Sequence, residues 1–503
     1  MSERRWPATA VAVAGLPLFI LLATANAAGY RYGVSDQAFH VPAVVHALTP
    51  SAFPRDAALL DVQARFMLFD DLIAAVVRAT GLSLETTFLF GYLTSTALLW
   101  AGLVLVGRAL FTSRWSLVLL GAAIAMRHRI PRTTVNSFEP YFYPRTLAFA
   151  LGVLAIAALL HRRWWLALAI TLAAALAHVT TGLWFLLLVG VAGARLDATI
   201  RRTLWAGAGI VLVATAWAAS SGWLVPLAAP MDDAWLSVMA ANDSLFPSRW
   251  PVWAWAANLV LPLMLVVIHR VRTHRGTARA EDAALVWGAL ALAGVFTLSL
   301  PLVTWRWTLP TQLQISRVFW LIDFLVIVYA AALVTEAAAA RRSRRLLPLV
   351  AVGVAALSVV RGGFVMLDEH RERSLFQVHL PASAWTDAMG WLARQPLDVH
   401  VLADPGHVAL YGSSVRVAAQ RDVVLEDVKD TAVALYSRDV AMRVRERRAR
   451  LDDFAHLSTL RATALARQYA VDYLVTAGEP LAFPVAYRNE RFRIYDLRPA
   501  RVH

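Results

Sequence analysis

Long apolar segments alternate with short polar ones over the first three quarters of the chain. A membrane-spanning helix needs about 20 mostly apolar residues, or fewer where the span is shielded by protein. About eleven segments meet this requirement. They are Pro7–Ala28, Leu84–Val106, Trp115–Met126, Tyr143–Leu160, Trp164–Ala177, Gly182–Ala194, Leu204–Ser220, Val252–Ile268, Ala283–Leu300, Leu313–Leu333 and Leu346–Leu367. The pattern predicts a polytopic α-helical membrane protein.

The pattern changes between about Asp368 and His503, where charged residues become frequent and apolar residues form short, strand-length runs. This alternation predicts a small α/β domain. The expected strands are His400–Ala403, Val423–Leu425, Asp472–Val475, Val485–Tyr487 and Phe492–Tyr495, and the expected helices are Ser383–Ala393, Val433–Arg450 and Leu457–Tyr469. We therefore divide the chain into a transmembrane module, residues 1–367 with an outer loop at 29–82, and a soluble domain, residues 368–503.

Composition supports a membrane protein, since 59% of the 503 residues are hydrophobic and only 16% are charged. We expect the first apolar segment to remain as an uncleaved helix, because many more follow it. The chain has no cysteine, which excludes disulfides and thiolate chemistry. The net charge of +14 comes almost entirely from arginines between apolar segments, with Lys429 the single lysine. Such a distribution reflects membrane topology and argues against a nucleic-acid partner.

The arginines predict an orientation, because cytoplasmic loops carry an excess of positive charge. With the N terminus inside, every cytoplasmic connection is basic. These connections contain Arg4/Arg5, Arg108/Arg114, Arg162/Arg163, Arg195/Arg201/Arg202, Arg270/Arg272/Arg275 and Arg341/Arg342/Arg344/Arg345. An odd number of spans then places the C-terminal domain outside a bacterial plasma membrane. The loop from Arg127 to Arg132 is basic although it lies outside, which invites a functional interpretation.

Polar residues beside the apolar segments gather on the outer side in this topology. Ionisable groups at membrane depth cost about 2.5–3.5 kcal/mol each, so a cluster of them marks a cavity, a pathway or an internal ion pair. The outer residues are Asp36, Gln37, His40, His46, Arg55, Asp56, Arg132, Glu139, Arg145, His178, Thr180, Thr181, Trp305, Arg306, Trp307, Gln312, Gln314 and Arg317. We expect no comparable cluster on the cytoplasmic side.

The first outer loop has an acid, Asp36, directly after the first apolar segment. Ser35 could cap a following amphipathic helix that lies along the membrane surface, with Phe39, Val44 and Leu48 on one side. This arrangement, the helix number, the short paired helices around His178 and the outer C-terminal domain together resemble integral-membrane glycosyltransferases of the GT-C fold. Bacterial mannosyltransferases and aminoarabinose transferases of this kind use a polyprenyl-phosphate-linked sugar as donor.

The resemblance implies roles for the outer residues. Asp36 is the expected base that activates the acceptor, although glutamine follows it where the family often has a second acid. Asp56 is the nearest later acid and the second catalytic candidate. The expected substrate-binding residues are Arg145, Arg317, Glu139, His178, Arg132, Gln314 and His40. Among these, Arg145, Arg317 and Arg132 suit a phosphate, because guanidinium groups donate paired hydrogen bonds and stay charged.

Each assignment has a structural alternative. Asp36 could cap a helix or pair with Arg55, and the arginines could pair with Glu139 or Asp323 or reach to lipid headgroups. His178 could be a hydrogen-bonded packing residue. His40 and His46 are six residues apart, a poor ligand spacing on one helix, so we predict no metal site there and leave a divalent cation open as a cofactor.

Three other functions stay open. A transporter also has many helices with polar residues inside the membrane, and a polymerase or ligase of surface polysaccharide also acts on lipid-linked sugars. An inactive scaffold with the same fold would explain the absent second acid. For the glycosyltransferase, the implied partners are a polyprenyl-phosphate-linked sugar, membrane lipid and a glycan, lipid or protein acceptor.

Overall fold

The computed structural model describes residues 8–65, 67–221, 229–240, 242–341, 343 and 345–502. Pro7 and the predicted cytoplasmic residues Arg4, Arg5, Arg342 and Arg344 lie outside these ranges. Contacts divide the chain into two compact units, which we describe separately. The first unit comprises Met1–Tyr30, Gly91–Met231 and Asn242–Leu375, and the second comprises Arg31–Phe90, Asp232–Ala241 and Phe376–His503.

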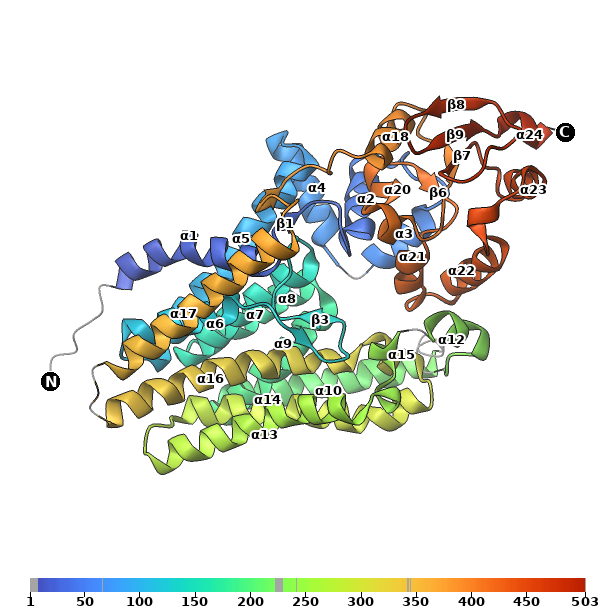
Figure 1. The fold of residues 1–503 in the computed structure, drawn as a ribbon. Helices are drawn as coiled ribbons and strands as arrows, with labels where there is room; N and C mark the ends of the chain where they lie inside the picture. Colours follow the sequence, from blue (N-terminus) through green and yellow to red (C-terminus); the bar gives the residue numbers. More distant parts are fainter. Residues whose placement is uncertain are drawn as a thin grey trace. The chain divides into compact units, whose positions relative to one another are not determined.

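The first unit is helical (Figure 1). Its helices are α1 (Ala8–Asn26), most of α5 (Leu84–Leu110), α6 (Arg114–Ala125), α7 (Pro144–Leu160), α8 (Trp164–Ala177), α9 (Val179–Leu196), α10 (Ala198–Ser220), α13 (Val252–His274), α14 (Ala280–Thr304), α15 (Thr308–Gln312), α16 (Val318–Ala340) and α17 (Leu346–Phe364). The unit also contains three short 3-10 turns, η1 (Asp243–Leu245), η2 (Pro247–Arg249) and η3 (Ile315–Arg317). A π-helical turn, η4 (Val365–Glu369), extends α17. A helix coincides with each predicted apolar segment.

Six of the helical segments in the described ranges are long and apolar enough to cross a membrane. They are Leu84–Leu110, Val179–Leu196, Val252–His274, Ala280–Thr304, Thr308–Ala340 and Leu346–Glu369. Four further apolar helices are shorter, at Ala12–Asn26, Arg114–Ala125, Pro144–Leu160 and Trp164–Ala177. These helices are consistent with a membrane protein, whereas eleven spans and the orientation of the chain stay predictions.

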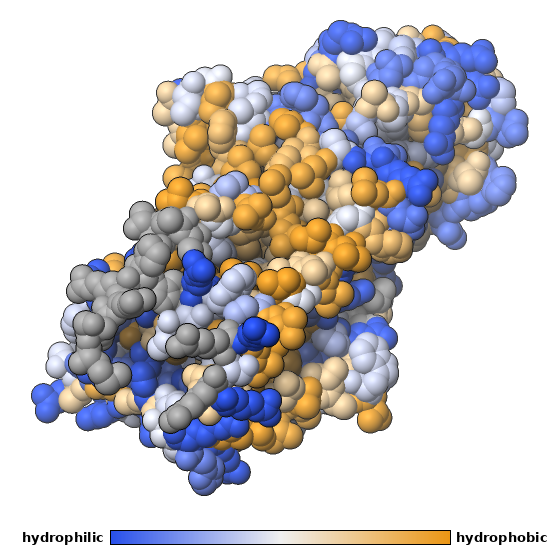
Figure 2. Space-filling model, turned by 60° about the vertical axis from the view of Figure 1, so that its left-hand side comes forward, coloured by the Kyte–Doolittle hydropathy of each residue, from blue (hydrophilic) through white to orange (hydrophobic). Residues whose placement is uncertain are grey.

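Small residues bring the helices of the first unit together. α7, α8 and α9 pack on one another, and α9 also packs on α14. A Cβ atom added at Gly152 of α7 would lie 2.2 Å from the ring of Phe185, and one at Gly288 of α14 would lie 2.5 Å from the carbonyl oxygen of Leu188. Hydrophobic side chains cover a broad area of the visible face in Figure 2. Exposed apolar side chains include Leu349, Val360 and Leu367, as expected for helices surrounded by lipid.

A buried ionic cluster lies where α13 ends, α14 begins and α16 ends. Arg272, only 2% exposed, pairs with Asp282 at 3.0 Å and with Glu336 at 2.9 Å. This end of the three helices is the one predicted to be cytoplasmic. Under the predicted orientation a polar cluster therefore also gathers on the cytoplasmic side. The sequence shows Arg272 and Asp282 as loop charges and does not show that they bury one another.

The second unit contains a five-stranded sheet with the order β6-β5-β7-β9-β8. Its strands are β5 (His400–Leu402), β6 (Asp422–Val423), β7 (Tyr473–Thr476), β8 (Val485–Arg488) and β9 (Arg493–Asp496). β6, β5 and β7 are parallel, with Val401 opposite both Val423 and Tyr473, and β7, β9 and β8 are antiparallel. The predicted sheet near the C terminus is confirmed, and each predicted strand overlaps an observed one, although β6 shares only Val423 with the predicted strand Val423–Leu425.

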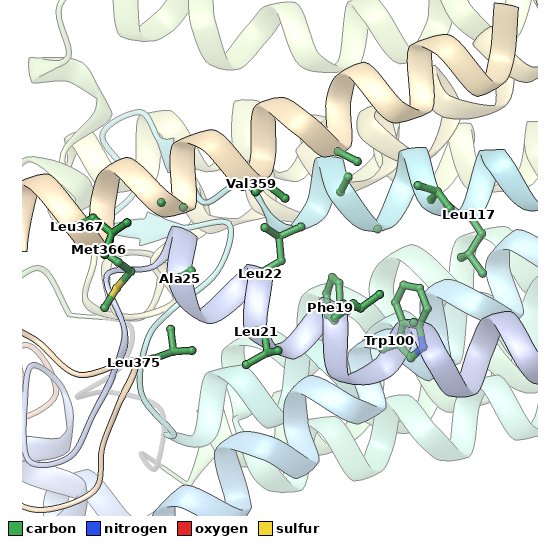
Figure 3. A pocket seen from close by; sticks show the side chains of 18 of the residues that line it. Phe19, Leu21, Leu22, Ala25, Trp100, Leu117, Val359, Met366, Leu367 and Leu375 are labelled. Carbon is green, nitrogen blue, oxygen red and sulfur yellow. The ribbon is translucent and has the colours of Figure 1, made fainter. Parts of the chain in front are cut away.

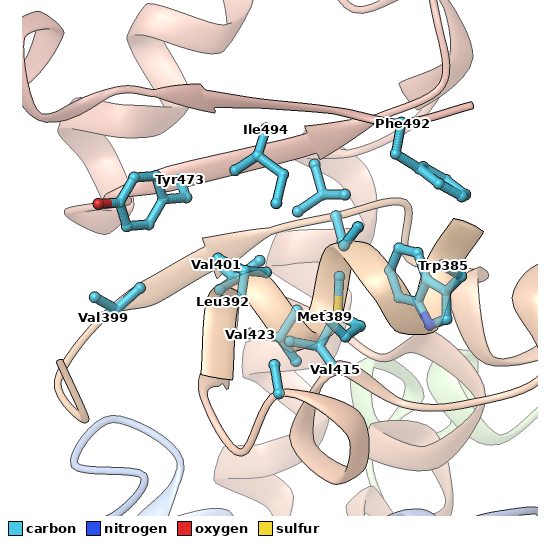
Figure 4. Close-up of a cluster of buried hydrophobic side chains, with 14 residues drawn as sticks. Trp385, Met389, Leu392, Val399, Val401, Val415, Val423, Tyr473, Phe492 and Ile494 are labelled. Carbon is cyan, nitrogen blue, oxygen red and sulfur yellow. The ribbon is translucent and has the colours of Figure 1, made fainter. Parts of the chain in front are cut away.

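Helices connect and cover these strands. They are α18 (Ala384–Ala393), α19 (His407–Tyr411), α20 (Val415–Ala418), α21 (Asp427–Ala434), α22 (Arg438–Arg450), α23 (Thr459–Tyr469) and α24 (Arg498–Val502), with the 3-10 turn η5 (Phe454–His456). The predicted helix 433–450 is interrupted, since Ser437 caps the start of α22 by accepting a hydrogen bond from the backbone N–H of Val440. α18 packs on the sheet, where Trp385, Met389 and Leu392 face Val401 and Ile494 (Figure 4).

The first outer loop belongs to the second unit by its contacts. It contains α2 (Gln37–Leu48), α3 (Ala57–Ala64) and α4 (Phe69–Thr80), and the segment 232–241 adds α12 (Asp233–Met239) to the same unit. This grouping differs from the sequence-based division, which placed residues 29–82 with the transmembrane module. Charges 360 or more residues apart in the chain hold the loop and the tail together, which the pattern of either segment alone does not show.

The predicted membrane-surface helix of the first outer loop is wrong in position. Residues 37–45 of α2 are buried by protein. The residue directly before the helix is Asp36 and not the predicted cap Ser35, which has a left-handed φ of 52°. α4 instead is amphipathic, since Leu72 and Val76, together with Leu68 directly before the helix, are exposed along one side. Only residues 81–83 separate α4 from α5, a candidate span.

Candidate functional site

The connection between α6 and α7 is a basic hairpin. β2 (Arg129–Ile130) pairs antiparallel with β3 (Val135–Asn136), which places Arg129 opposite Asn136. The turn between the strands has positive φ values at Arg132 and Thr134. The short strands therefore hold the basic loop noted in the sequence in a defined conformation.

A polar cavity of about 520 Å³ opens beside this hairpin. Its lining consists of Arg127, His128, Arg129, Thr134, Asn136 and Arg361, which we call the cationic pocket. Arg361 comes from α17 and is fixed by three hydrogen bonds. It donates to the carbonyl oxygen and Oδ1 of Asn26 at 3.2 and 2.7 Å and to the carbonyl oxygen of Arg127 at 2.8 Å.

Two carboxylates support the cationic pocket. Glu139 accepts a hydrogen bond from Nδ2 of Asn136 at 2.8 Å and pairs with Arg127 at 3.4 Å. Asp323 of α16 lies 2.9 Å from Nε2 of His128, and this hydrogen bond raises the pKa of His128. The three guanidinium groups outnumber the two carboxylates, so the pocket has a net positive charge with which an anion can interact.

The chemistry of the cationic pocket is suited to a phosphate. Guanidinium groups donate paired hydrogen bonds to phosphate oxygens. Arg361 lies within the candidate span Leu346–Glu369, whereas Arg129 is exposed on the hairpin. One wall of the pocket therefore belongs to a candidate span.

Among the predicted substrate-binding residues of the first unit, Glu139 contacts the lining of the cationic pocket through Arg127 and Asn136. Arg145 is buried near the start of α7, with its guanidinium carbon 4.9 Å from the ring centroid of Tyr143. Arg132 lies 5.9 Å from the ring centroid of Trp253. Both arginines thus have an aromatic neighbour, and their predicted contact with phosphate stays a prediction.

The other three predicted binding residues have clear local positions. Nδ1 of His178 accepts a hydrogen bond from the backbone N–H of Thr181 at 3.2 Å and so caps α9. This is the packing alternative that the sequence left open. Gln314 is buried with a left-handed φ of 50°, and Arg317 ends η3 directly before α16.

Asp36 lies in the second unit, at the residue preceding α2. Its Oδ1 is 3.2 Å from Nζ of Lys429, and its side chain is 24% exposed. Asp36 therefore forms an ion pair with Lys429, the single lysine, whereas the sequence left Arg55 open as its partner. Since its carboxylate is partly exposed, Asp36 can still be reached by a hydroxyl group.

Asp56, the second predicted catalytic acid, is fully buried. Its Oδ2 accepts hydrogen bonds from Nε of Arg416 at 2.8 Å and from the backbone N–H of Val423 at 3.2 Å, and Arg443 pairs with Oδ1. Burial would raise the pKa of Asp56, but the two arginines hold it well below its ordinary value. The geometry favours a structural role for Asp56 rather than the predicted catalytic role.

The remaining predicted residue, His40, is also buried. Its Nδ1 lies 3.7 Å from Oδ1 of Asp70, and its ring contacts Phe39 and Phe69 edge-on. Over the described ranges the structure gathers no group of three His, Asp or Glu side chains that could hold a metal ion. The structure thus places Asp36, Asp56 and His40 in one unit and the other predicted residues in the other.

The sequence pointed to part of the cationic pocket. The basic loop was singled out because it contradicted the charge rule, but only Arg132 was chosen from it. Arg361 was missed, although an arginine inside the last apolar segment was a usable signal. Lys429 was noted only for its rarity.

Comparison with known proteins assigns no family. No family model matches the chain, and no curated protein matches it. The function must therefore be argued from the membrane helices, the cationic pocket and the accessibility of Asp36.

Proposed function

We propose that this chain is a membrane glycosyltransferase that moves a sugar from a polyprenyl-phosphate donor to an acceptor on the extracytoplasmic face of a bacterial plasma membrane. The cationic pocket carries the proposal. It combines three arginines, and one of them, Arg361, belongs to an apolar candidate span. A phosphate attached to a hydrocarbon chain matches both properties, because its anion needs donors at the boundary where its chain enters the membrane.

The proposed reaction is a displacement at the anomeric carbon of the donor sugar. The acceptor oxygen forms a new bond to this carbon while the bond between the carbon and the phosphate oxygen breaks. The electron pair of the broken bond stays on the phosphate, and cations that stabilise this developing charge lower the barrier. The proton of the acceptor hydroxyl passes to a carboxylate, for which Asp36 is the proposed base. Asp36 suits this role better than Asp56, because only Asp36 is partly exposed.

The cationic pocket is tested in liposomes that contain the purified chain and labelled polyprenyl-phosphate sugars. Arg129→Gln removes an exposed guanidinium from the pocket, and Arg275→Gln, an exposed arginine after α13, is the matched control. A hydrogen bond to a charged group contributes about 1.5–3 kcal/mol, so we expect transfer to fall about 10- to 100-fold with Arg129→Gln and to be unchanged with Arg275→Gln. Equal rates in both variants would exclude the pocket.

The base is tested with a second pair of variants. Asp36→Asn should remove transfer but keep binding of the labelled donor, while the exposed acid Asp71 provides the control Asp71→Asn. Transfer that survives Asp36→Asn unchanged would eliminate this base. Donor binding without transfer in the unmodified chain would favour the inactive scaffold, and movement of the intact donor across the bilayer would favour a transporter.

A further inference from the structure

A long apolar groove runs along the first unit, separate from the cationic pocket. Its volume is about 800 Å³. α1 contributes Phe19, Leu22 and Ala25, and α17 with η4 contributes Val359 and Met366 (Figure 3). Trp100 of α5 and four residues of α6, Leu117, Val118, Gly121 and Ala122, also line it. The groove therefore lies among apolar helices of the membrane-embedded part.

Glycines shape the wall of this groove. A Cβ atom added at Gly15 of α1 would lie 2.3 Å from the indole of Trp100, and one at Gly121 of α6 would lie 2.8 Å from the same ring. The two glycines thus let Trp100 fit closely against α1 and α6. On α17, a Cβ atom added at Gly363 would meet no described atom within 4 Å. Gly363 leaves a side-chain-sized space on the wall that a hydrocarbon chain can occupy.

One end of the groove is charged. Arg371 and Arg373 belong to its lining, close in sequence to the apolar lining residues Leu367 and Leu375. Nη2 of Arg371 pairs with Asp368 at 3.3 Å, and Nε of Arg373 pairs with Glu372 at 3.1 Å. A headgroup at this end would meet guanidinium and carboxylate groups together. A phosphodiester with an attached ammonium group offers the matching charges.

We propose that this groove binds a phospholipid of the surrounding bilayer, with acyl chain against α1, α6 and α17 and its phosphate at Arg371 and Arg373. The class of phospholipid that fits best has a zwitterionic, amine-containing headgroup. The medium that meets an open apolar groove on candidate membrane helices is the bilayer itself. Exposed Leu18, Leu21 and Leu367 line the groove and are placed to contact that medium.

The occupant is inferred to differ from the proposed sugar donor. The lining of the groove and the lining of the cationic pocket share no residue, and each has arginines of its own. A polyprenyl phosphate whose anion lies in the cationic pocket would leave Arg371 and Arg373 without a ligand. This inference does not depend on the glycosyltransferase proposal, because it concerns a separate cavity.

Native mass spectrometry of the purified full chain tests the proposal, with phosphatidylethanolamine, phosphatidylglycerol and undecaprenyl phosphate as defined probes. Gly363→Leu fills the groove, and Gly353→Leu is its matched control, because a Cβ at Gly353 of the same helix also meets no described atom within 4 Å and Gly353 does not line the groove. We expect one retained phosphatidylethanolamine in the unmodified chain and in Gly353→Leu, and at least a tenfold loss in Gly363→Leu.

A second variant keeps the test independent of folding defects. Arg371→Gln with Arg373→Gln alters exposed or partly exposed side chains and should weaken phosphatidylethanolamine binding several-fold without changing the melting temperature. Equal lipid retention in Gly363→Leu and Gly353→Leu would overturn the proposal. So would a groove that retains undecaprenyl phosphate in preference to both phospholipids, since that result would identify the groove as the site of the donor chain.

Discussion

Arg416 is the residue whose loss should damage the second unit most. Its guanidinium is 1% exposed and donates to Asp56 at 2.8 Å and to both oxygens of Asp430 at 2.6 and 3.1 Å. Glu426 lies 3.6 Å away. Arg416→Met keeps much of the buried volume but leaves these carboxylates without their shared cation. A buried charge that loses its partner retains the cost of its lost hydration.

The structure sets the expected magnitude. Breaking a buried pair by removing one partner costs about 3–5 kcal/mol. A domain of 150–250 residues loses about 2–4 °C of melting temperature per kcal/mol, so Arg416→Met should lower the transition of this unit by about 6–20 °C. The control is Arg438→Gln, which breaks a pair with Asp232 at 2.6 Å whose side chains are 53% and 44% exposed. An exposed pair contributes at most about 1 kcal/mol, or about 2–4 °C.

Thermal unfolding of the full chain in detergent measures both shifts. Hydrogen exchange in α20 and α21 assigns the loss to the second unit, because amides there should exchange faster in Arg416→Met than in Arg438→Gln. Acidification provides a further check, since protonation of the unpaired carboxylates should recover part of the loss. Equal shifts in the two variants would refute the assignment of Arg416 as the centre of the network.

Three shorter predictions follow from other parts of the structure. Burial raises the pKa of Asp422 to about 6 and lowers the pKa of His400 to about 4. As the pH rises between about 4 and 6, Asp422 therefore destabilises the fold and His400 stabilises it. In Asp422→Asn the melting temperature should rise more steeply with pH, and an unchanged slope would contradict these pKa shifts. The chain has no cysteine, so single cysteines can be introduced and labelled with a nitroxide. The label on Leu72→Cys of α4 should be accessible to oxygen in lipid, and the label on exposed Leu460→Cys should be accessible to a water-soluble reagent. The same accessibility at both positions would exclude α4 from the bilayer surface. Gly152→Ala should lower the free energy of unfolding by about 1–3 kcal/mol, because the added methyl group overpacks the contact with α9. Gly209→Ala, where a Cβ meets no described atom within 4 Å, should not lower the melting temperature. Equal melting temperatures in the two variants would contradict the packing of α7 on α9.

The sequence predicted the helices and the sheet well because their signals are local. Apolar length marks α14 or α17 directly, and short apolar runs between polar turns mark β5 and β7. Helix α4 was missed because its apolar run, residues 72–77, is far too short for a membrane span and lies between charged residues. α2, in contrast, looked amphipathic and is buried by protein. Burial depends on segments far away in the chain, which a periodic pattern does not reveal.

The candidate site shows the same limit. Asp36 and Asp56 are both acids of the first outer loop, and both were catalytic candidates from the sequence. The distinction comes from Arg416 and Arg443, which are more than 350 residues later and bury Asp56 completely. Arg361 joins the cationic pocket for a comparable reason, because its partner Arg127 is 234 residues away.

The position of Asp36 depends on the same network as the stability of the second unit. Lys429, which pairs with Asp36, directly precedes Asp430 in α21, and Asp430 is held by Arg416. Arg416→Met should therefore displace Lys429 and reduce transfer by way of Asp36, even below the melting transition. Lys429→Gln should reduce transfer on its own. If Arg416 acts through Lys429, the double variant should transfer no more slowly than Lys429→Gln alone. Multiplied losses in the double variant would show that the two residues act separately, and would remove the link between the buried network and the proposed base.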